Sequence, residues 1–490
     1  MKSRTYFLLI LLSTVAASVL ADKPNIVVML ADDMGFGEVQ HFNPKRGKIK
    51  TPHLDRLAQS GMVFTDAHSG SSVCSPTRYG LMTGRYAWRT RLQRGVLTGG
   101  ESLIAQDRLT LAKMLRKQGY HTAVIGKWHL GMFYDGVKNA GKVQVGAKIT
   151  HGPIDRGGFD EFHGFHHARQ MDVWIENDVV AHRIDAVEML PKLTSKAVEY
   201  IHSRKDKGQP FFLYVPWNSP HSPVVPTKKW QGKSGLNSHA DFVMQTDDSF
   251  GQVLQALKDT DQFTNTLVIC SSDNGTSGPT SKMSQLIKLG HHPSGDLRGS
   301  KADIWDGGHR VPFIASWPGV IKPGRRSSAL VCLTDIFATA AEITGHKLPP
   351  TEGVDSMSFA QDLHGKADLF RTSVIHHSIE GQFAIREHNW KLICCPGSGG
   401  WSKPGTKTAL KQAQMNGQPS IQLYDMEQDL GEQKNLAAEM PAKVKALRKM
   451  LDEDIKLGRS TSGPRQKNDV AIVVDKWKAK SDKNNKKKAK

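Results

Sequence analysis

The sequence predicts an α/β protein with a large mixed, mostly parallel sheet sandwiched by helices, and a smaller C-terminal antiparallel sheet with one helix. Up to about residue 350, apolar β-rich runs alternate with amphipathic segments, which is typical of a parallel sheet covered on both faces. Beyond that point the apolar runs are short and closely spaced, as in an antiparallel meander. The chain of 490 residues is also too long for one ordinary hydrophobic core.

The elements of the first part follow from the hydrophobic pattern. A helix begins near Thr51, and another covers residues 109–118 and stops at Gly119. Two further helices are expected at residues 193–203 and 242–258. The apolar runs expected to form strands are 23–31, 61–67, 120–126, 210–215 and 265–272. In such a sheet, polar residues at the carboxyl ends of the strands converge on one crevice, where function is expected.

The second part contains three short runs that predict a meander, at residues 383–387, 390–395 and 422–426. Residues 396–417 are rich in Pro, Gly and Lys and are expected to form an irregular loop. Residues 440–455 are amphipathic and predict one helix. We therefore expect a catalytic domain at 22–355 and a C-terminal subdomain at 356–460.

The N-terminus has the three parts of a signal peptide. Lys2 and Arg4 precede an apolar run over residues 6–19, and Val19-Leu20-Ala21 supplies small residues for cleavage. An uncleaved anchor is the alternative, but the run is short for a bilayer span. No later segment is long and apolar enough to span. We expect a signal peptide at 1–21, cleavage near Ala21, a secreted or periplasmic protein, and no membrane span in the mature chain.

The formal net charge of +19 is not evenly spread along the chain. Residues 476–490 contain eight lysines and one acid, Asp482, a net charge of +7. Such a run has too little apolar surface to bury, so residues 461–490 are expected to form a basic, disordered tail. Adhesion to an anionic polymer is the functional alternative. No nucleic-acid partner is expected.

The most specific motif is Cys74-Ser-Pro-Thr-Arg78, followed by Thr83-Gly-Arg85. Here the sequence resembles the type I sulfatases of the alkaline phosphatase superfamily, which include the arylsulfatases. The resemblance extends to about residue 456 and implies an alkaline phosphatase-like fold. It also implies hydrolysis of sulfate esters, and oxidation of Cys74 to Cα-formylglycine by a formylglycine-generating or anaerobic maturation enzyme.

Two polar pairs follow predicted strands: Asp32-Asp33 after the first and Asp273-Asn274 after a later one. Three carboxylates and an amide oxygen are hard donors that suit calcium rather than zinc. Each pair could instead be a simple turn or helix cap. The resemblance assigns all four residues to one Ca²⁺ ion, completed by the modified Cys74.

Four basic residues match positions of the same family: Lys127, His129, His221 and Lys301. A sulfate monoester is a stable anion, so cations must absorb charge on the sulfuryl oxygens, and Arg78, Lys127 and Lys301 would do so together with calcium. The resemblance implies that Asp273 is the base for the attacking hydroxyl. It also implies that His221 with Lys301 protonates the leaving alcohol and that His129 assists the second step.

A loop-rich insertion offers aromatic faces and hydrogen-bond donors that a carbohydrate would use. Its candidate substrate-binding residues are His163, His166, Arg169 and Trp174, with His167 nearby, although loop histidines are often plain surface residues. A sulfated glycan or polysaccharide is the expected substrate, with aryl sulfates and other sulfated small molecules as artificial ones.

Three alternatives remain open at this point. One is a phosphonate or phosphate ester hydrolase on the same fold, and another is a non-catalytic binder of sulfated polymers. The third concerns Cys74, which if unmodified would be expected to have a lowered pKa beside the cations. The other four cysteines, Cys270, Cys332, Cys394 and Cys395, allow three disulfide pairings or none.

Overall fold

The computed structural model describes residues 23–137, 143–366 and 371–478. The predicted signal peptide at 1–21 and the last twelve residues of the expected basic tail lie outside these ranges. Within them, no helix combines the length and the apolar character that crossing a bilayer requires.

A ten-stranded sheet forms the centre of the molecule, in the order β12-β2-β11-β10-β1-β9-β3-β6-β7-β8. Its central strands, β10, β1, β9, β3 and β6, are parallel, whereas β11, β7 and β8 introduce antiparallel pairs. The strand bounds are β1 (Asn25–Asp32), β2 (Met62–His68), β3 (His121–Lys127), β6 (Glu161–Phe165), β7 (Val173–Glu176), β8 (Val179–Arg183), β9 (Phe211–Pro220), β10 (Thr266–Ser272), β11 (Phe313–Ser316) and β12 (Arg325–Cys332). The predicted mixed, mostly parallel sheet is confirmed.

Helices cover both faces of this sheet, because alternate side chains of each strand point to opposite sides. Val28 and Leu30 of β1 belong to the core packed with α3 and α9, whereas Val27 and Met29 belong to the core packed with α4 and α5. The helices are α1 (Pro52–Ser60), α2 (Cys74–Thr83), α3 (Leu111–Lys117), α4 (Ala186–Ser203), α5 (Ser238–Asp259), α6 (Gly278–Ser281), α7 (Met283–Lys288), α8 (Asp306–His309), α9 (Asp335–Ile343) and α10 (Ala360–Leu363). A short hairpin of β4 (Phe133–Tyr134) and β5 (Ile149–Thr150) lies apart from the sheet.

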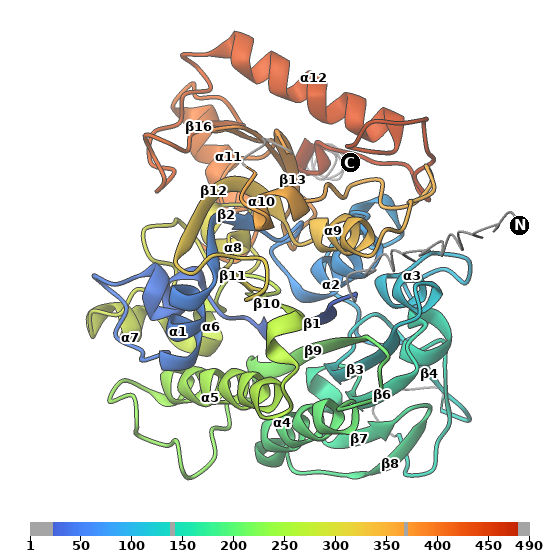
Figure 1. Cartoon of the computed structure of the whole chain (residues 1–490). Coiled ribbons are helices and arrows are strands. Elements are labelled where there is room, and N and C mark those ends of the chain that lie inside the picture. The colour runs from blue at the N-terminus through green and yellow to red at the C-terminus, as the bar shows by residue number, and fades with distance from the viewer. Residues whose placement is uncertain (1–22, 138–142, 367–370, 479–490) are drawn as a thin grey trace, which may run out of the picture.

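The C-terminal part forms a separate four-stranded antiparallel sheet, β13-β14-β15-β16, which lies above the large sheet in Figure 1. Its elements are β13 (Ser373–His377), β14 (Phe383–Glu387), β15 (Trp390–Ile393), β16 (Gln422–Asp425), α11 (Thr406–Met415) and α12 (Pro441–Leu457). The predicted meander with one packed helix, α12, is confirmed. The expectation of an irregular loop at 396–417 was wrong in part, because α11 forms within it.

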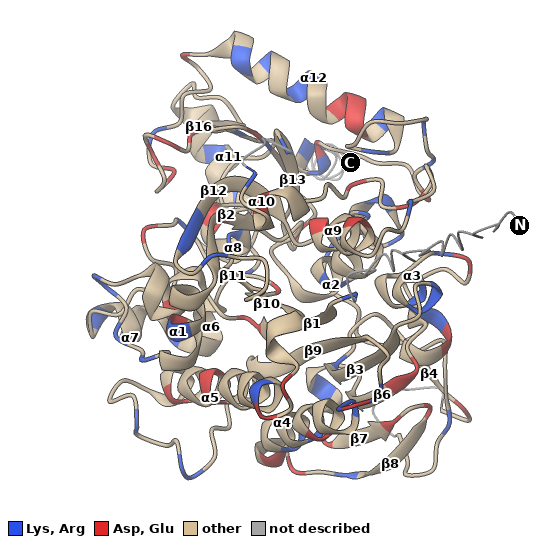
Figure 2. Ribbon diagram, in the orientation of Figure 1, with Lys and Arg blue, Asp and Glu red and all other residues tan. Residues whose placement is uncertain are grey.

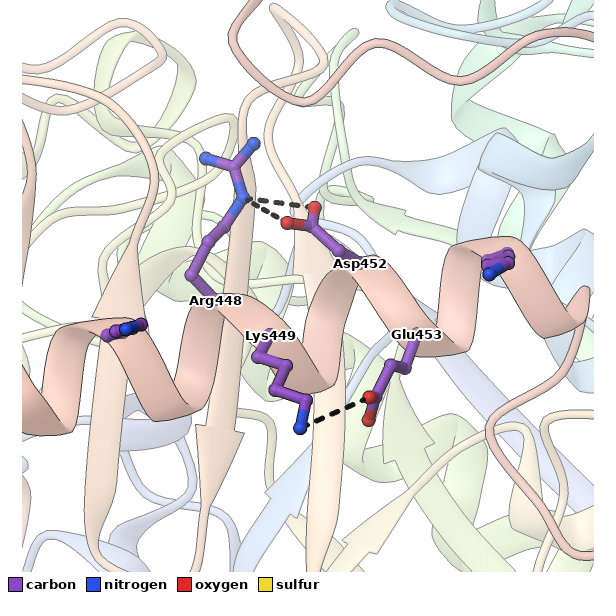
Figure 3. Close-up of a pocket in the computed structure, with 6 residues that line it drawn as sticks. Arg448, Lys449, Asp452 and Glu453 are labelled. Carbon is purple, nitrogen blue, oxygen red and sulfur yellow. Dashed lines mark hydrogen bonds and ion pairs between the residues drawn. The ribbon is translucent and has the colours of Figure 1, made fainter.

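Helix α12 packs its buried Leu447 and Leu451 on the small sheet and turns charged residues to solvent. Lys and Arg dominate its N-terminal half, and acids follow (Figure 2). Arg448 pairs with Asp452, and Lys449 with Glu453, each four residues apart (Figure 3). Such exposed pairs add only a few tenths of a kcal/mol each, so the buried leucines fix this helix.

The chain after α12 stays in contact with the folded protein through residue 478. Asp469 forms an ion pair with Arg85 at 2.9 Å, and its backbone N–H donates to the carbonyl of Arg89. The indole of Trp477 donates to the carbonyl of Cys394. Disorder expected from residue 461 therefore does not hold for residues 461–478, because polar partners and an aromatic anchor offset the low apolar content of this segment.

All five cysteines are free and buried.

Candidate active site

The two polar pairs predicted from the sequence meet at one edge of the large sheet. Strands β1 and β10 are parallel neighbours with Ala31 opposite Ser272, so the residues that follow them lie side by side. The backbone N–H of Asp33 donates to Asp273 Oδ1 at 3.2 Å, and Asn274 Nδ2 donates to Asp33 Oδ1 at 2.8 Å. All four side chains are buried, at 1 % exposure or less.

Cys74 enters this site from the first position of α2, a helix whose ten residues are all buried. One ligand atom each of Asp32, Asp33, Cys74 and His221 lies within 4.8 Å of the others. Because the nucleophile candidate is the first residue of a helix, its side chain also lies at the positive end of the helix dipole. The end of β1, the start of α2 and the residue after β9 therefore meet at one point.

Three cations neutralise the carboxylates. Lys127 Nζ lies 2.5 Å from Asp32 Oδ2, and Lys301 Nζ lies 2.5 Å from Asp33 Oδ1. The Lys301 ammonium also lies 3.5 Å from Cys74 Sγ and contacts the sulfur.

Arg78 binds Asp273, the third carboxylate of the site. Its Nε and Nη2 donate to Asp273 Oδ2 at 3.0 and 2.8 Å, and its Nη1 donates to the carbonyl of Lys127 at 2.8 Å. Its guanidinium is completely buried, so these bonds act where water screens weakly. One residue thus ties the β10 edge to the end of β3.

Two buried oxygens of this cluster are left without a hydrogen-bond donor among the described residues: Asp32 Oδ1 and Asn274 Oδ1. Arg78 Nη2 lies 3.5 Å from the first of these oxygens and makes no hydrogen bond to it. An unsatisfied buried oxygen costs free energy, and a bound cation satisfies it. The cluster is therefore a candidate metal-binding site, and its oxygen donors fit a hard divalent ion such as calcium.

The thiol of Cys74 does not have the lowered pKa expected for an unmodified cysteine among cations. Complete burial raises its pKa to about 12, and although Lys127 and Lys301 act to lower it, Asp273 and Asp32 act to raise it. The expectation was wrong because it considered the cations without the desolvation and the facing carboxylates. An unmodified Cys74 would remain a protonated, weakly nucleophilic thiol near neutral pH.

The predicted histidines flank the cluster. His221 donates from Nδ1 to the carbonyl of Ser222 at 2.7 Å, which leaves Nε2 3.7 Å from Asp33 Oδ2. His129 donates from Nε2 to the carbonyl of Leu97 at 2.7 Å. Burial, with Lys127 nearby, holds the pKa of His129 well below its usual value, so this imidazole is neutral.

Among the candidate substrate residues, His166 lies near the cluster and Arg169 follows on the surface. The ring of His166 lies 6.5 Å from that of His129, and the ring of His167 stacks on His129 at 5.9 Å. Nε2 of both His166 and His167 lacks a hydrogen-bond partner in the described part of the chain. Arg169, in the next turn, is exposed, and burial, followed by the charges of Lys127 and Arg169, lowers the pKa of His167 to about 4.

His163 and Trp174 are placed differently. Their rings stack on each other at 6.5 Å, His163 pairs with Glu161, and the indole of Trp174 donates to Glu176 and lies under Lys192 of α4. These contacts are with the sheet and α4 and not with the cluster around Cys74. Alternation along β6 explains this, because His163 lies two residues before the strand end and points into the α4 face.

Sequence reasoning missed Ser272, the last residue of β10. Its hydroxyl accepts from the N–H of Met34 at 2.9 Å and donates to the carbonyl of Asn274 at 2.9 Å. It thus joins the two loops that carry the acid pairs. The sequence feature that could have identified Ser272 is its position directly before Asp273.

Known proteins resemble this chain over most of its length. A family model described as Sulfatase matches residues 24–346, about two thirds of the sequence. The N-acetylgalactosamine-6-O-sulfatase of Bacteroides thetaiotaomicron is 30% identical over 88% of this chain and 93% of that protein. Human arylsulfatase A is 30% identical over 90% and 89%.

A solved structure agrees with these matches. It is a sulfatase from work on the metabolism of multiple glycosaminoglycans by Bacteroides thetaiotaomicron, and it superposes with a TM-score of 0.78 at 29% identity, covering 88% of this chain and 99% of that one. The predicted resemblance is confirmed: the chain belongs to the sulfatase family of the alkaline phosphatase superfamily and is a sulfuric ester hydrolase.

Proposed function

We propose that this enzyme removes sulfate from a sulfated glycan, with one Ca²⁺ ion and a formylglycine made from Cys74. The observation that carries the proposal is the buried cluster itself, in which Lys127, Lys301 and Arg78 surround Cys74. Two acceptor oxygens there have no hydrogen-bond donor within residues 23–137, 143–366 and 371–478. Removing one such preorganised cation from an active site typically costs on the order of 10²–10³ in rate.

The metal would be held by Asp32, Asp33, Asp273 and Asn274 together with the modified Cys74. Bound calcium would draw charge from a sulfuryl oxygen. The hydrated aldehyde of formylglycine would supply one hydroxyl to attack sulfur and a second to release sulfate.

The chain's own side chains would do the remaining work. Lys127 and Lys301 would each bind a sulfuryl oxygen, exchanging part of their contact with Asp32 and Asp33. Asp273 would take the proton of the attacking hydroxyl. His221, with its Nε2 turned toward the site, would share with Lys301 the protonation of the leaving alcohol.

His129 would assist the release of sulfate. Its neutral state supports this role, because a neutral imidazole can accept a proton whereas an imidazolium cannot. His166, whose ring lies 6.5 Å from that of His129, and the exposed Arg169 are the proposed contacts for the sugar.

The substrate class is proposed from the relatives. The named activity of the Bacteroides relative is on N-acetylgalactosamine-6-O-sulfate groups, so a 6-O-sulfated amino sugar is the first substrate to test. We also propose that residues 1–21 direct secretion or periplasmic export, and that a maturation enzyme acts on Cys74. N-terminal sequencing of the mature protein tests the export proposal.

Two measurements test the mechanism. Mass spectrometry of the peptide that contains Cys74 should show a loss of about 18 Da, the difference between cysteine and formylglycine. An unmodified thiol in an active preparation would refute the nucleophile. Chelation should abolish activity and calcium should restore it, whereas full activity after exhaustive chelation would refute the metal.

A substrate panel tests the specificity. It should compare 6-O-sulfated N-acetylgalactosamine, other sulfated sugars, an aryl sulfate and a phosphonate ester at equal concentration. A sulfated sugar should give the highest kcat/KM. A preference for the phosphonate ester would refute the proposed substrate class.

A further inference from the structure

A second buried cluster lies between the large sheet and the C-terminal sheet, and it consists of histidines. His68 ends β2, His309 ends α8 and His376 lies on β13. All three side chains are inaccessible to solvent. One nitrogen of each ring lies within 4.8 Å of the others, although the residues are more than 60 positions apart in the sequence.

One nitrogen of each ring has a hydrogen-bond partner outside the three histidines, and we call the other one the inner nitrogen. The outer nitrogens have partners: His68 Nε2 lies 2.8 Å from Asp66 Oδ1, His309 Nε2 lies 3.1 Å from the carbonyl of Ile304, and His376 Nδ1 lies 3.1 Å from the carbonyl of Ser69. Histidines that bind metals almost always donate their second N–H to a carboxylate or a backbone carbonyl in this way.

Two of the three inner nitrogens lie within hydrogen-bonding distance of each other. Nδ1 of His68 and Nδ1 of His309 lie 3.1 Å apart, close to the spacing of about 3.3 Å that two nitrogens bound to one tetrahedral ion would have. Nε2 of His376 is buried and has no hydrogen-bond partner among the described residues. Buried polar atoms without a partner are rare and require an explanation.

Burial keeps the imidazoles neutral, which metal binding requires. Burial lowers the pKa of each of the three histidines. The charged neighbours are three acids and three bases whose formal charges cancel: Asp66, Asp306, Glu432, Arg310, Arg386 and Lys391.

We propose that His68, His309 and His376 form a second metal site, which binds a zinc-class divalent ion and links the two sheets. Nitrogen ligands suit zinc, whereas the oxygen ligands around Cys74 suit calcium, so the two sites select different ions. The rings of His309 and His376 now stack at 3.8 Å, and they would tilt apart to point their nitrogens at one ion.

A metal-free arrangement competes with this proposal. Lys391 Nζ lies 3.2 Å from His309 Nε2 and could donate to it, after which His309 Nδ1 would donate to His68. That chain satisfies His68 and His309 but leaves His376 Nε2 without a partner. The two arrangements differ in metal content, which can be measured directly.

The first experiment uses the full chain and its Cys74→Ala variant. Each is stripped with a strong chelator, incubated with zinc, desalted and analysed for zinc by mass spectrometry. We expect about one zinc ion per chain in both proteins, because the variant changes residue 74 of the calcium site but none of the histidines. Absence of zinc from both proteins, or its loss from Cys74→Ala alone, would overturn the proposal.

The second experiment uses two matched variants in the Cys74→Ala background. His376→Phe keeps a ring of similar size but removes the nitrogens, whereas His377→Phe changes the next residue of β13, which is equally buried and lies outside the cluster. Zinc should bind and raise the thermal midpoint only when His376 is present. Equal zinc binding by the two variants would overturn the proposal.

Cobalt(II) provides a readout that does not depend on the two histidine variants. Bound by three imidazoles in a tetrahedral site, cobalt should give visible d–d absorption bands in the Cys74→Ala protein. If His376→Phe fails to fold, the presence or absence of these bands together with the zinc content of Cys74→Ala decides the question.

Discussion

Replacement of Arg78 by alanine tests the idea that one buried guanidinium holds the site together. The structure gives this side chain three hydrogen bonds, two to Asp273 Oδ2 and one to the carbonyl of Lys127. The substitution leaves the Asp273 carboxylate buried without its main partner. Breaking a buried pair by removing one member costs about 3–5 kcal/mol, which agrees with the loss of two charge-assisted bonds worth about 1.5–3 kcal/mol each.

The same change should lower kcat/KM by about 10²–10³, since Arg78 is one of the cations facing the reacting group. Arg78→Lys should recover part of the stability and less of the activity, because an ammonium restores the charge but not the planar fork. The assays are chemical denaturation and hydrolysis of an aryl sulfate, with the exposed Arg326→Ala as control. A loss below about 1 kcal/mol together with less than a tenfold fall in kcat/KM would refute the reasoning.

Three further predictions concern the rest of the fold. Arg89→Met should destabilise the protein by about 3–5 kcal/mol in chemical denaturation, since it leaves Asp355 buried with its 2.8 Å partner removed; a neutral result would show that the pair is replaceable. A chain that ends at residue 463 should have a lower thermal midpoint than one that ends at residue 478, because it lacks the contact of Asp469 with Arg85; equal midpoints would contradict the packing of this segment. Lys476→Met should stabilise the protein at pH 7, because burial penalises the charged ammonium and lowers the pKa of Lys476 to about 8. Between about pH 8 and 10.5 the folded state therefore binds fewer protons than the unfolded state. The free energy of unfolding of the wild type should rise with pH through that window, so the advantage of the variant should shrink toward pH 10.5. An advantage that grows with pH would contradict the lowered pKa of Lys476.

The sequence by itself predicted five of the ten strands of the large sheet and the acid pairs that follow two of them. Apolar runs and their flanking polar residues are local patterns, and parallel strands necessarily bring their carboxyl ends to one edge. For this reason the approach of Asp32 and Asp33 to Asp273 and Asn274 could be predicted before any coordinates. Boundaries were less certain, and α4 begins at Ala186, before the predicted residue 193.

Only the tertiary structure decided which polar groups are buried and what they face. The pKa of Cys74 rises because burial outweighs the nearby lysines, and no local pattern reports that balance. His163 turns to the α4 face, whereas His166, three residues later, lies beside His129. The meeting of His68 with His376 depends on contact between two sheets. Such long-range packing sets the electrostatics of each group, and for that reason the chemistry of individual side chains had to be taken from the fold.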